Sequence, residues 1–138
     1  MMHKHILLAV DPDIKNAKAI NEVQKLVGTE SIVTILHVMG EQDVQASVRL
    51  GTHVNELKKI RSEKLQDTKD LLEAANIQYE EIIERGNPKE KIVDYANNGN
   101  YDIVVVSNHK AQENKKVVLG SVSHKIAKRA HIPVLIVK

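Results

Sequence analysis

The residues best suited to chemistry in this sequence surround the segment Gly120-Ser121-Val122-Ser123, where the pattern predicts the start of a helix. Backbone N–H groups at a helix start, two hydroxyls and the positive end of the helix dipole together favour binding of an anion. The preceding loop adds Lys110, Lys115 and Lys116 against a single carboxylate, Glu113. A plain N-cap role for the first serine is the simpler structural alternative.

Other residue types argue against metal and covalent chemistry. The chain has no cysteine, which excludes disulfides, thiolate catalysis and Cys-ligated zinc. Its 7 histidines form no His-x3-His pair beside a carboxylate, and we interpret none as a metal ligand. Neither a Gly-x4-Gly-Lys-Ser loop nor a nucleophile elbow is present. We therefore predict no catalytic residue and no metal site.

The elements that must position these residues follow from apolar periodicity. Continuous apolar or β-branched runs predict strands at 6–10, 31–38, 77–84, 103–106 and 133–137. Helical spacing predicts helices over 14–27 (stopped by Gly28), 54–75 (with a helical approach over 43–52), from 88 onward, and 121–130. At the third of these, Asn87 fits the N-cap position and Pro88 the first helical position. The alternation indicates an α/β fold with a mostly parallel sheet and helices on both faces.

Composition fits a single soluble domain spanning residues 1–138. Of the residues, 42% are hydrophobic and 28% charged, which is ordinary for a globular protein. The balance of 20 basic and 18 acidic side chains, with no Trp or Phe for stacking on bases, argues against nucleic-acid binding. The apolar run Ile6–Val10 is too short for a signal peptide or a membrane span. We expect a cytoplasmic protein that binds neither nucleic acid nor membrane.

Strand ends supply further candidates, because open parallel sheets bind ligands beyond the carboxyl ends of their strands. Asp11, Val38 and Ser107 stand at or directly after three predicted strand ends. Asp11 is equally typical of a turn that closes a strand.

Several segments together resemble the universal stress protein family over the whole chain. Each is weak alone, and their order and spacing carry the resemblance. The segments are Ala9-Val10-Asp11, His37-Val38, Gly86-Asn87-Pro88, 101–106, 119–123 and 132–137. The family implies a Rossmann-like, adenine nucleotide alpha hydrolase-like fold: a five-stranded parallel sheet of strand order 3-2-1-4-5 with helices on both faces. It also implies a site for ATP or AMP.

By this resemblance, Ala9, Asp11 and Val38 line an adenine–ribose pocket. The residues along the ribose and phosphates are Val106, Ser107, His109, Lys110, Gly120, Ser121, Val122 and Ser123. For each hydrophobic member, plain core packing is the alternative.

The sequence departs from the motif Gly-x2-Gly-x9-Gly-(Ser/Thr) of the ATP-binding members. Ser107 and Lys110 replace its first two glycines, and only the pair Gly120-Ser121 is kept. A Cβ atom at Ser107 and a long side chain at Lys110 obstruct the close approach of backbone to phosphate. We therefore predict a degraded ATP-binding loop and no certain cofactor.

The leading hypothesis is a stress-response protein acting as a homodimeric regulator or adaptor, with unidentified protein partners. The alternative is an ATP-binding switch or slow ATPase that uses the helix start at Gly120-Ser121, with Lys110 facing the phosphates. A flavoprotein-like or nucleotide-hydrolase subunit on the same fold is disfavoured, because no Ser-Gly-Gly-x-Asp-Ser loop is present.

The last strand carries the prediction of a homodimer. It runs from Pro133 to Val137, is almost wholly apolar, and lies at a sheet edge in the family's strand order. An apolar open edge is an aggregation hazard unless it is covered or paired. We expect antiparallel pairing with the same strand of a second copy.

Overall fold

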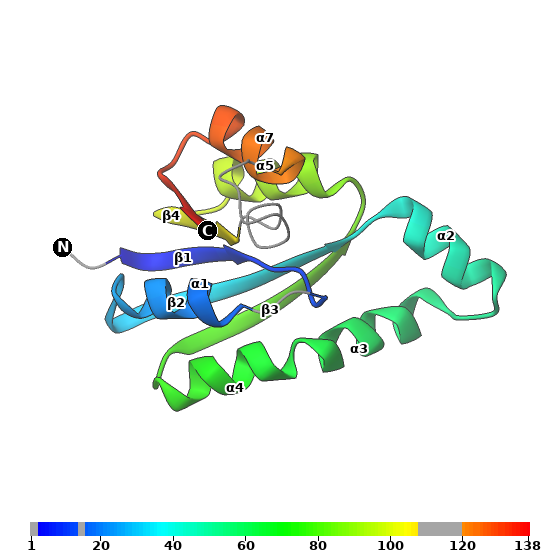
Figure 1. The fold of residues 1–138 in the computed structure, drawn as a ribbon, viewed down its shortest axis with the longest axis horizontal. Helices are drawn as coiled ribbons and strands as arrows, with labels where there is room; N and C mark the ends of the chain where they lie inside the picture. Colours follow the sequence, from blue (N-terminus) through cyan, green and yellow to red (C-terminus); the bar gives the residue numbers. More distant parts are fainter. Residues whose placement is uncertain (1–2, 14–15, 108–119) are drawn as a thin grey trace.

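The computed structural model of the chain describes residues 3–13, 16–107 and 120–138. In these ranges five strands run parallel in one sheet of order β3-β2-β1-β4-β5, and helices lie on both of its faces (Figure 1). The elements are β1 (His3–Ala9), α1 (Ala17–Gln24), β2 (Val27–Met39), α2 (Glu41–Arg49), α3 (Val54–Lys64), α4 (Gln66–Ala74), β3 (Gln78–Arg85), α5 (Pro88–Asn98), β4 (Ile103–Ser107), α7 (Ser121–Arg129) and β5 (Val134–Val137). The predicted fold class and strand order are confirmed.

Two apolar layers enclose the sheet, one against each face. Alternate residues of β1 serve opposite layers, as the period of a strand requires: Ile6 and Leu8 face α1 and α4, whereas Leu7 and Ala9 face α5 and α7. Residues Ile6 to Leu8 are fully buried, so β1 is covered on both faces. A continuous apolar run is therefore the correct signature of this central strand.

The boundary between α1 and β2 differs from the prediction. The helix ends at Gln24 rather than at 27, and the strand starts at Val27 rather than at 31. Gly28 does not stop a helix: its N–H donates to Ser31 Oγ at 2.8 Å, inside an irregular stretch of β2. There the register with β1 shifts, so that β2 has extra residues opposite His3 to His5.

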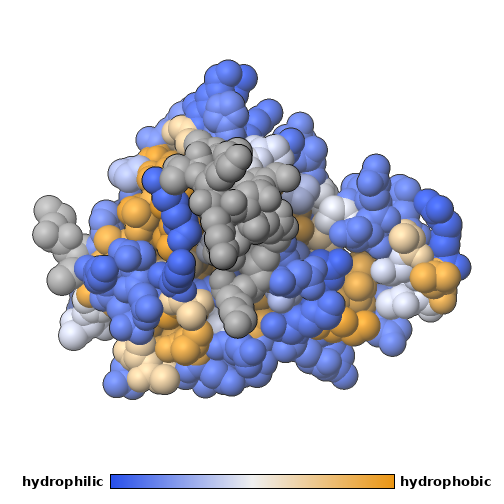
Figure 2. All heavy atoms as spheres, in the orientation of Figure 1, coloured by the Kyte–Doolittle hydropathy of each residue, from blue (hydrophilic) through white to orange (hydrophobic). Residues whose placement is uncertain are grey.

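The predicted long helix over 54–75 is two helices that meet at Leu65. The backbone there leaves helical angles (φ −88°, ψ 4°), while the side chain is buried at 1% exposure. The predicted approach over 43–52 is a separate helix, α2. In Figure 1, α2 projects beyond the sheet, and Figure 2 shows apolar spheres at the far end of this projection. Val48 in α2 and Leu50 directly after it are exposed.

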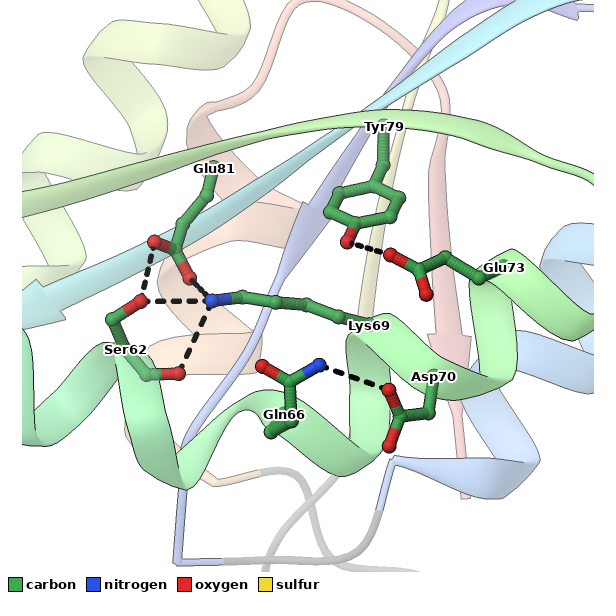
Figure 3. Close-up of polar contacts among 7 residues, drawn as sticks. All are labelled: Ser62, Gln66, Lys69, Asp70, Glu73, Tyr79 and Glu81. Atoms are coloured by element: carbon green, nitrogen blue, oxygen red, sulfur yellow. Dashed lines mark hydrogen bonds and ion pairs between the residues drawn. The ribbon is translucent and has the colours of Figure 1, made fainter.

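Charged side chains fasten the edge strand β3 to the helices beneath it (Figure 3). Lys69 Nζ lies 2.6 Å from Glu81 Oε2 and donates to Ser62 Oγ at 2.8 Å. Ser62 Oγ in turn donates to Glu81 Oε1 at 2.7 Å, which closes a triangle between α3, α4 and β3. Lys69 is only 13% exposed, so this pair offsets the cost of burying its ammonium group.

In the described ranges, no helix is both long and apolar enough to cross a membrane.

Replacing Lys69 with Met removes the ammonium while keeping the aliphatic stem. It leaves the Glu81 carboxylate, 23% exposed, without its charge partner. We expect the free energy of unfolding in urea to fall by about 2 kcal/mol. The matched control is Lys25→Met, which breaks a pair with Glu22 whose side chains are 70% and 38% exposed. That control should cost less than about 0.5 kcal/mol, and equal losses in the two variants would contradict the prediction.

Candidate functional site

The carboxyl ends of the three central strands lie side by side, with β2 extending furthest, to Met39. Ala9, the last residue of β1, pairs with Leu36 of β2 on one side and Val106 of β4 on the other. This register brings the segment after β1, the end of β2 and the end of β4 together at one edge of the sheet, as the sequence predicts.

A cavity of about 310 Å³ opens at this edge. It is lined by Ala9, Val10, Asp11, His37, Val38, Pro88, Ile92, Val106, Ser107, Gly120, Ser121, Val122 and Ser123. Every predicted site residue within the described ranges is among them. The two others, His109 and Lys110, lie outside the described residues, as does the rest of the predicted loop up to residue 119.

The start of α7 supplies the polar wall of the cavity. Gly120, with extended backbone (φ −65°, ψ 159°), is the N-cap, and Ser121 is the first helical residue rather than the cap. Ser123 is 4% exposed, so the two serines place one accessible and one buried hydroxyl on the lining. The first turn of α7 contains no acidic residue. No carboxylate of this turn therefore compensates the positive end of the helix dipole.

The apolar wall comes from the layer beneath α5 and α7. Val38, Val106 and Ile92 belong to this layer and are each at most 7% exposed. They are core residues whose outer surfaces border the cavity. Core packing and a position at the cavity, considered above as alternatives, therefore both apply to them.

The turn between β3 and α5 brings Pro88 to the cavity. Gly86 adopts φ +147°, a conformation that favours glycine, and its N–H donates to Met39 O at 3.0 Å, which ties the turn to the end of β2. Asn87 then caps α5 by accepting from the N–H groups of Lys89 and Glu90. The predicted cap and proline position are confirmed.

Asp11 closes the turn after β1 and also lines the cavity. Its Oδ1 accepts from the backbone N–H of Asp13 at 2.9 Å, the geometry of a turn that closes a strand. The same residue lines the cavity and is half-buried. A carboxylate at this place is suited to accept hydrogen bonds from ligand hydroxyls.

His37 is a lining residue that the motif analysis did not select. Its ring is tied to two other elements, and its residue is 5% exposed. An arginine donates only, so Nε2 accepts from Arg61 Nη1 at 3.0 Å. The proton of the neutral ring therefore lies on Nδ1, which donates to Val10 O at 3.2 Å. The ring joins the segment after β1 to α3.

Burial lowers the pKa of His37 below its ordinary value of 6.5. The hydrogen bond to the Val10 carbonyl raises the pKa, the charge of Arg61 lowers it further, and the carboxylates of Asp11 and Asp13 raise it. Burial prevails, so the folded state holds the ring neutral.

Val10, Pro88 and Ile92 are also lining residues that the site prediction omitted. The Gly-Asn-Pro turn and the buried spacing of α5 were visible in the sequence, but neither shows that α5 crosses the strand ends. In the described ranges, no group of three or more His, Asp or Glu side chains could hold a metal ion.

A parallel sheet of order 3-2-1-4-5, with helices on both faces and a cavity at its strand ends, defines a Rossmann-like α/β protein. The family model of the universal stress proteins matches residues 2–138, and the chain belongs to this family.

Individual relatives agree with this assignment. The chain is 30% identical to Universal stress protein YxiE of Bacillus subtilis, over 99% of this chain and 100% of that protein. It is also 30% identical to Universal stress protein MJ0577 of Methanocaldococcus jannaschii, over 100% and 96%. The solved structure of MJ0577 superposes with a TM-score of 0.83 at 29% identity, covering 100% of this chain and 97% of that one. The universal stress protein of Archaeoglobus fulgidus, solved with dAMP, matches at TM-score 0.70 and 20% identity over both whole chains.

The neutral His37 ring makes stability depend on pH. An unfolded chain takes up a proton near pH 6.5, whereas the folded chain keeps His37 neutral to lower pH. Protons therefore favour the unfolded state, and the free energy of unfolding should fall as the pH drops from about 6.5 to about 5. In His37→Gln this fall should be smaller, whatever the variant's stability at neutral pH. Urea denaturation at several pH values between about 6.5 and about 5 measures this change in the free energy of unfolding.

The control is His124→Gln, which removes an exposed histidine of α7. Its pH profile should parallel that of the unchanged protein. A profile of His37→Gln as steep as the control's would show that His37 does not carry the effect.

Proposed function

We propose that this universal stress protein is a cytoplasmic stress-response regulator or adaptor that acts as a homodimer, with a cavity that takes an adenine mononucleotide and holds ATP weakly. The observation that carries the nucleotide site is the gathering of the family's site positions, from three strands and one helix start, around one cavity. A volume of about 310 Å³ lies at the lower end of the range for small-ligand sites.

The cavity has chemically distinct parts that suit such a ligand. Ala9, Val38 and Val106 offer apolar surface for a base, and Asp11 offers an acceptor for ribose hydroxyls. The hydroxyls of Ser121 and Ser123 lie where a helix start favours a phosphate. The dAMP in the A. fulgidus relative supports the choice of an adenine mononucleotide, since that chain shares this fold.

The weak hold on ATP rests on residue types. Ser107 lines the cavity at the end of β4, where the ATP-binding motif of the family has glycine. A Cβ atom there keeps the backbone away from a phosphate chain. Calorimetric titration tests the proposal: AMP should bind more tightly than ATP. Equal or tighter binding of ATP would favour the alternative of an ATP-dependent switch, and no binding of either would refute the nucleotide site.

Restoring both glycines should recover ATP binding. In Ser107→Gly/Lys110→Gly we expect ATP affinity to rise by about tenfold or more, because the backbone then approaches the phosphates. The matched control Ser107→Ala/Lys110→Ala keeps both Cβ atoms and should stay weak. If both double variants lose affinity, Lys110 supplies a phosphate charge and the switch hypothesis is favoured. Low micromolar ATP affinity in the unchanged protein would contradict the degraded loop.

The homodimer is proposed through the predicted strand Pro133–Val137, of which 134–137 form β5. This strand lies at the sheet edge, and Val134, Leu135 and Ile136 are only half-buried. Pro133 O accepts from Val104 N–H at 3.0 Å, so alternate residues Val134 and Ile136 turn their backbone groups to the open edge. An antiparallel partner strand would satisfy them.

Ile136→Pro removes one outward N–H without removing a donor to β4. We expect this variant to be monomeric, or its dimer to be weakened at least about tenfold. Ile136→Ala loses the same side chain but keeps the N–H group, and it should remain dimeric. Light scattering at micromolar concentration distinguishes the two. A mass of 15.5 kDa for the unchanged protein would refute the dimer, and dimers of both variants would move the interface elsewhere.

A further inference from the structure

A polar path leads from the cavity to the helices on the other face of the sheet. His37 alternates along β2 with Leu36 and Val38, which belong to the layer under α5 and α7. Its side chain therefore points to the opposite face, toward α3. Although the residue borders the cavity, its ring acts from behind the lining, where it bonds to the carbonyl of Val10.

Arg61 determines the protonation state and the tautomer of the His37 ring. Its side chain is 16% exposed and donates to His37 Nε2, so the ring must be neutral and must carry its proton on Nδ1. Of the two neutral tautomers, only this one can donate to Val10 O. Arg61 also lies 3.7 Å from Asp43 of α2. The path thus runs from α2 and α3 through the ring to the residue that precedes Asp11.

We propose that Arg61 is a positioning residue of the cavity. Acting through neutral His37, it holds the Val10–Asp11 segment in the binding conformation. Protonation of His37 breaks the hydrogen bond to Arg61, which frees the ring and the segment bonded to it from α3 and weakens nucleotide binding. The inference rests on the proposed adenine nucleotide site and adds its regulation by protons. Arg61 itself does not line the cavity.

The charges around the ring explain the direction of the effect. A proton added at Nε2 points at the guanidinium of Arg61, now 3.0 Å away, so the hydrogen bond is lost and two cations oppose each other. Asp11 and Asp13, in the segment after β1, attract the protonated ring, so the ring stays with that segment. Asp43, 69% exposed, offers the displaced guanidinium a carboxylate. The lost hydrogen bond and the repulsion between the two cations loosen the link between α3 and the segment that carries Asp11.

Binding of cyclic AMP tests the proposal. Its phosphodiester and base do not titrate in the relevant range, so a change of affinity with pH reports on the protein. Calorimetry at about pH 7.5 and about pH 5 should show the affinity of the unchanged protein falling about fivefold or more. His37→Gln cannot titrate, and its affinity should be nearly independent of pH. Arg61→Gln should bind about fivefold or more weakly at the higher pH.

Two variants separate positioning from general effects of charge. Arg61→Lys keeps a donor for His37 Nε2 and should restore most of the affinity lost in Arg61→Gln. Lys59→Gln removes one positive charge from an exposed position of the same helix and should behave as the unchanged protein at both pH values. The proposal is overturned if Arg61→Gln binds normally, or if His37→Gln keeps the pH dependence of the unchanged protein.

A measurement without nucleotide distinguishes failure of this inference from failure of the proposed function. Nitrogen-15 spectra of the imidazole should show the proton on Nδ1 at neutral pH, and the amide signals of Val10 and Asp11 should shift as His37 titrates. In His37→Gln these two amides should no longer respond. A proton on Nε2, or amides that ignore the titration, refutes the inference even if cyclic AMP binds. If cyclic AMP does not bind while the amides respond, the cavity's proposed ligand is wrong and the coupling stands.

Discussion

The parallel register of β1 between β2 and β4 is the constraint on which both the core and the cavity depend. Because alternate residues of β1 serve opposite apolar layers, a shift by one residue would exchange the two faces and expose both layers to the wrong neighbours. The same register sets Ala9 level with Leu36 and Val106, so that three strand ends meet. Core packing thus fixes the floor of the cavity.

The sequence was sufficient for the fold where burial and local signals agree. Strand β1 reads as buried because it is buried on both faces, and α5 starts where Asn87 and Pro88 predict. Prediction of element boundaries from the sequence failed where a local signal competes with a contact to a residue farther along the chain. Gly28 resembles a helix stop, but the course of the chain there is set by Ser31, whose hydroxyl also donates to His3 O on β1. Likewise, nothing local marks Leu65 as the meeting point of two helices, although the apolar spacing slips along that stretch.

The residues of the candidate site also differ in whether the sequence alone could predict them. Residues at strand ends and at the α7 start could be selected, because parallel topology alone brings them to one edge. Ile92 and Pro88 could not, since their place at the cavity follows from the way α5 crosses the sheet. The state of His37 is less predictable still: its proton position is dictated by Arg61, 24 residues away on another element. Spacing motifs identify side chains that line a cavity. They miss the side chains that orient this lining from the side away from the cavity.

The two open edges of the sheet are treated differently, and this difference connects the proposed dimer to the cavity. On β3, glutamates and an arginine occupy the edge strand, and Glu81 is held inward by Lys69 and Ser62. Charge of this kind discourages pairing with another strand. On β5, four apolar residues in succession offer no such protection. Because β5 pairs with β4, with Val137 opposite Ser107, a partner strand on β5 would lie one strand away from a residue of the cavity wall. Dimer formation and ligand binding would then both act on β4, the first through its ladder with β5 and the second at Ser107.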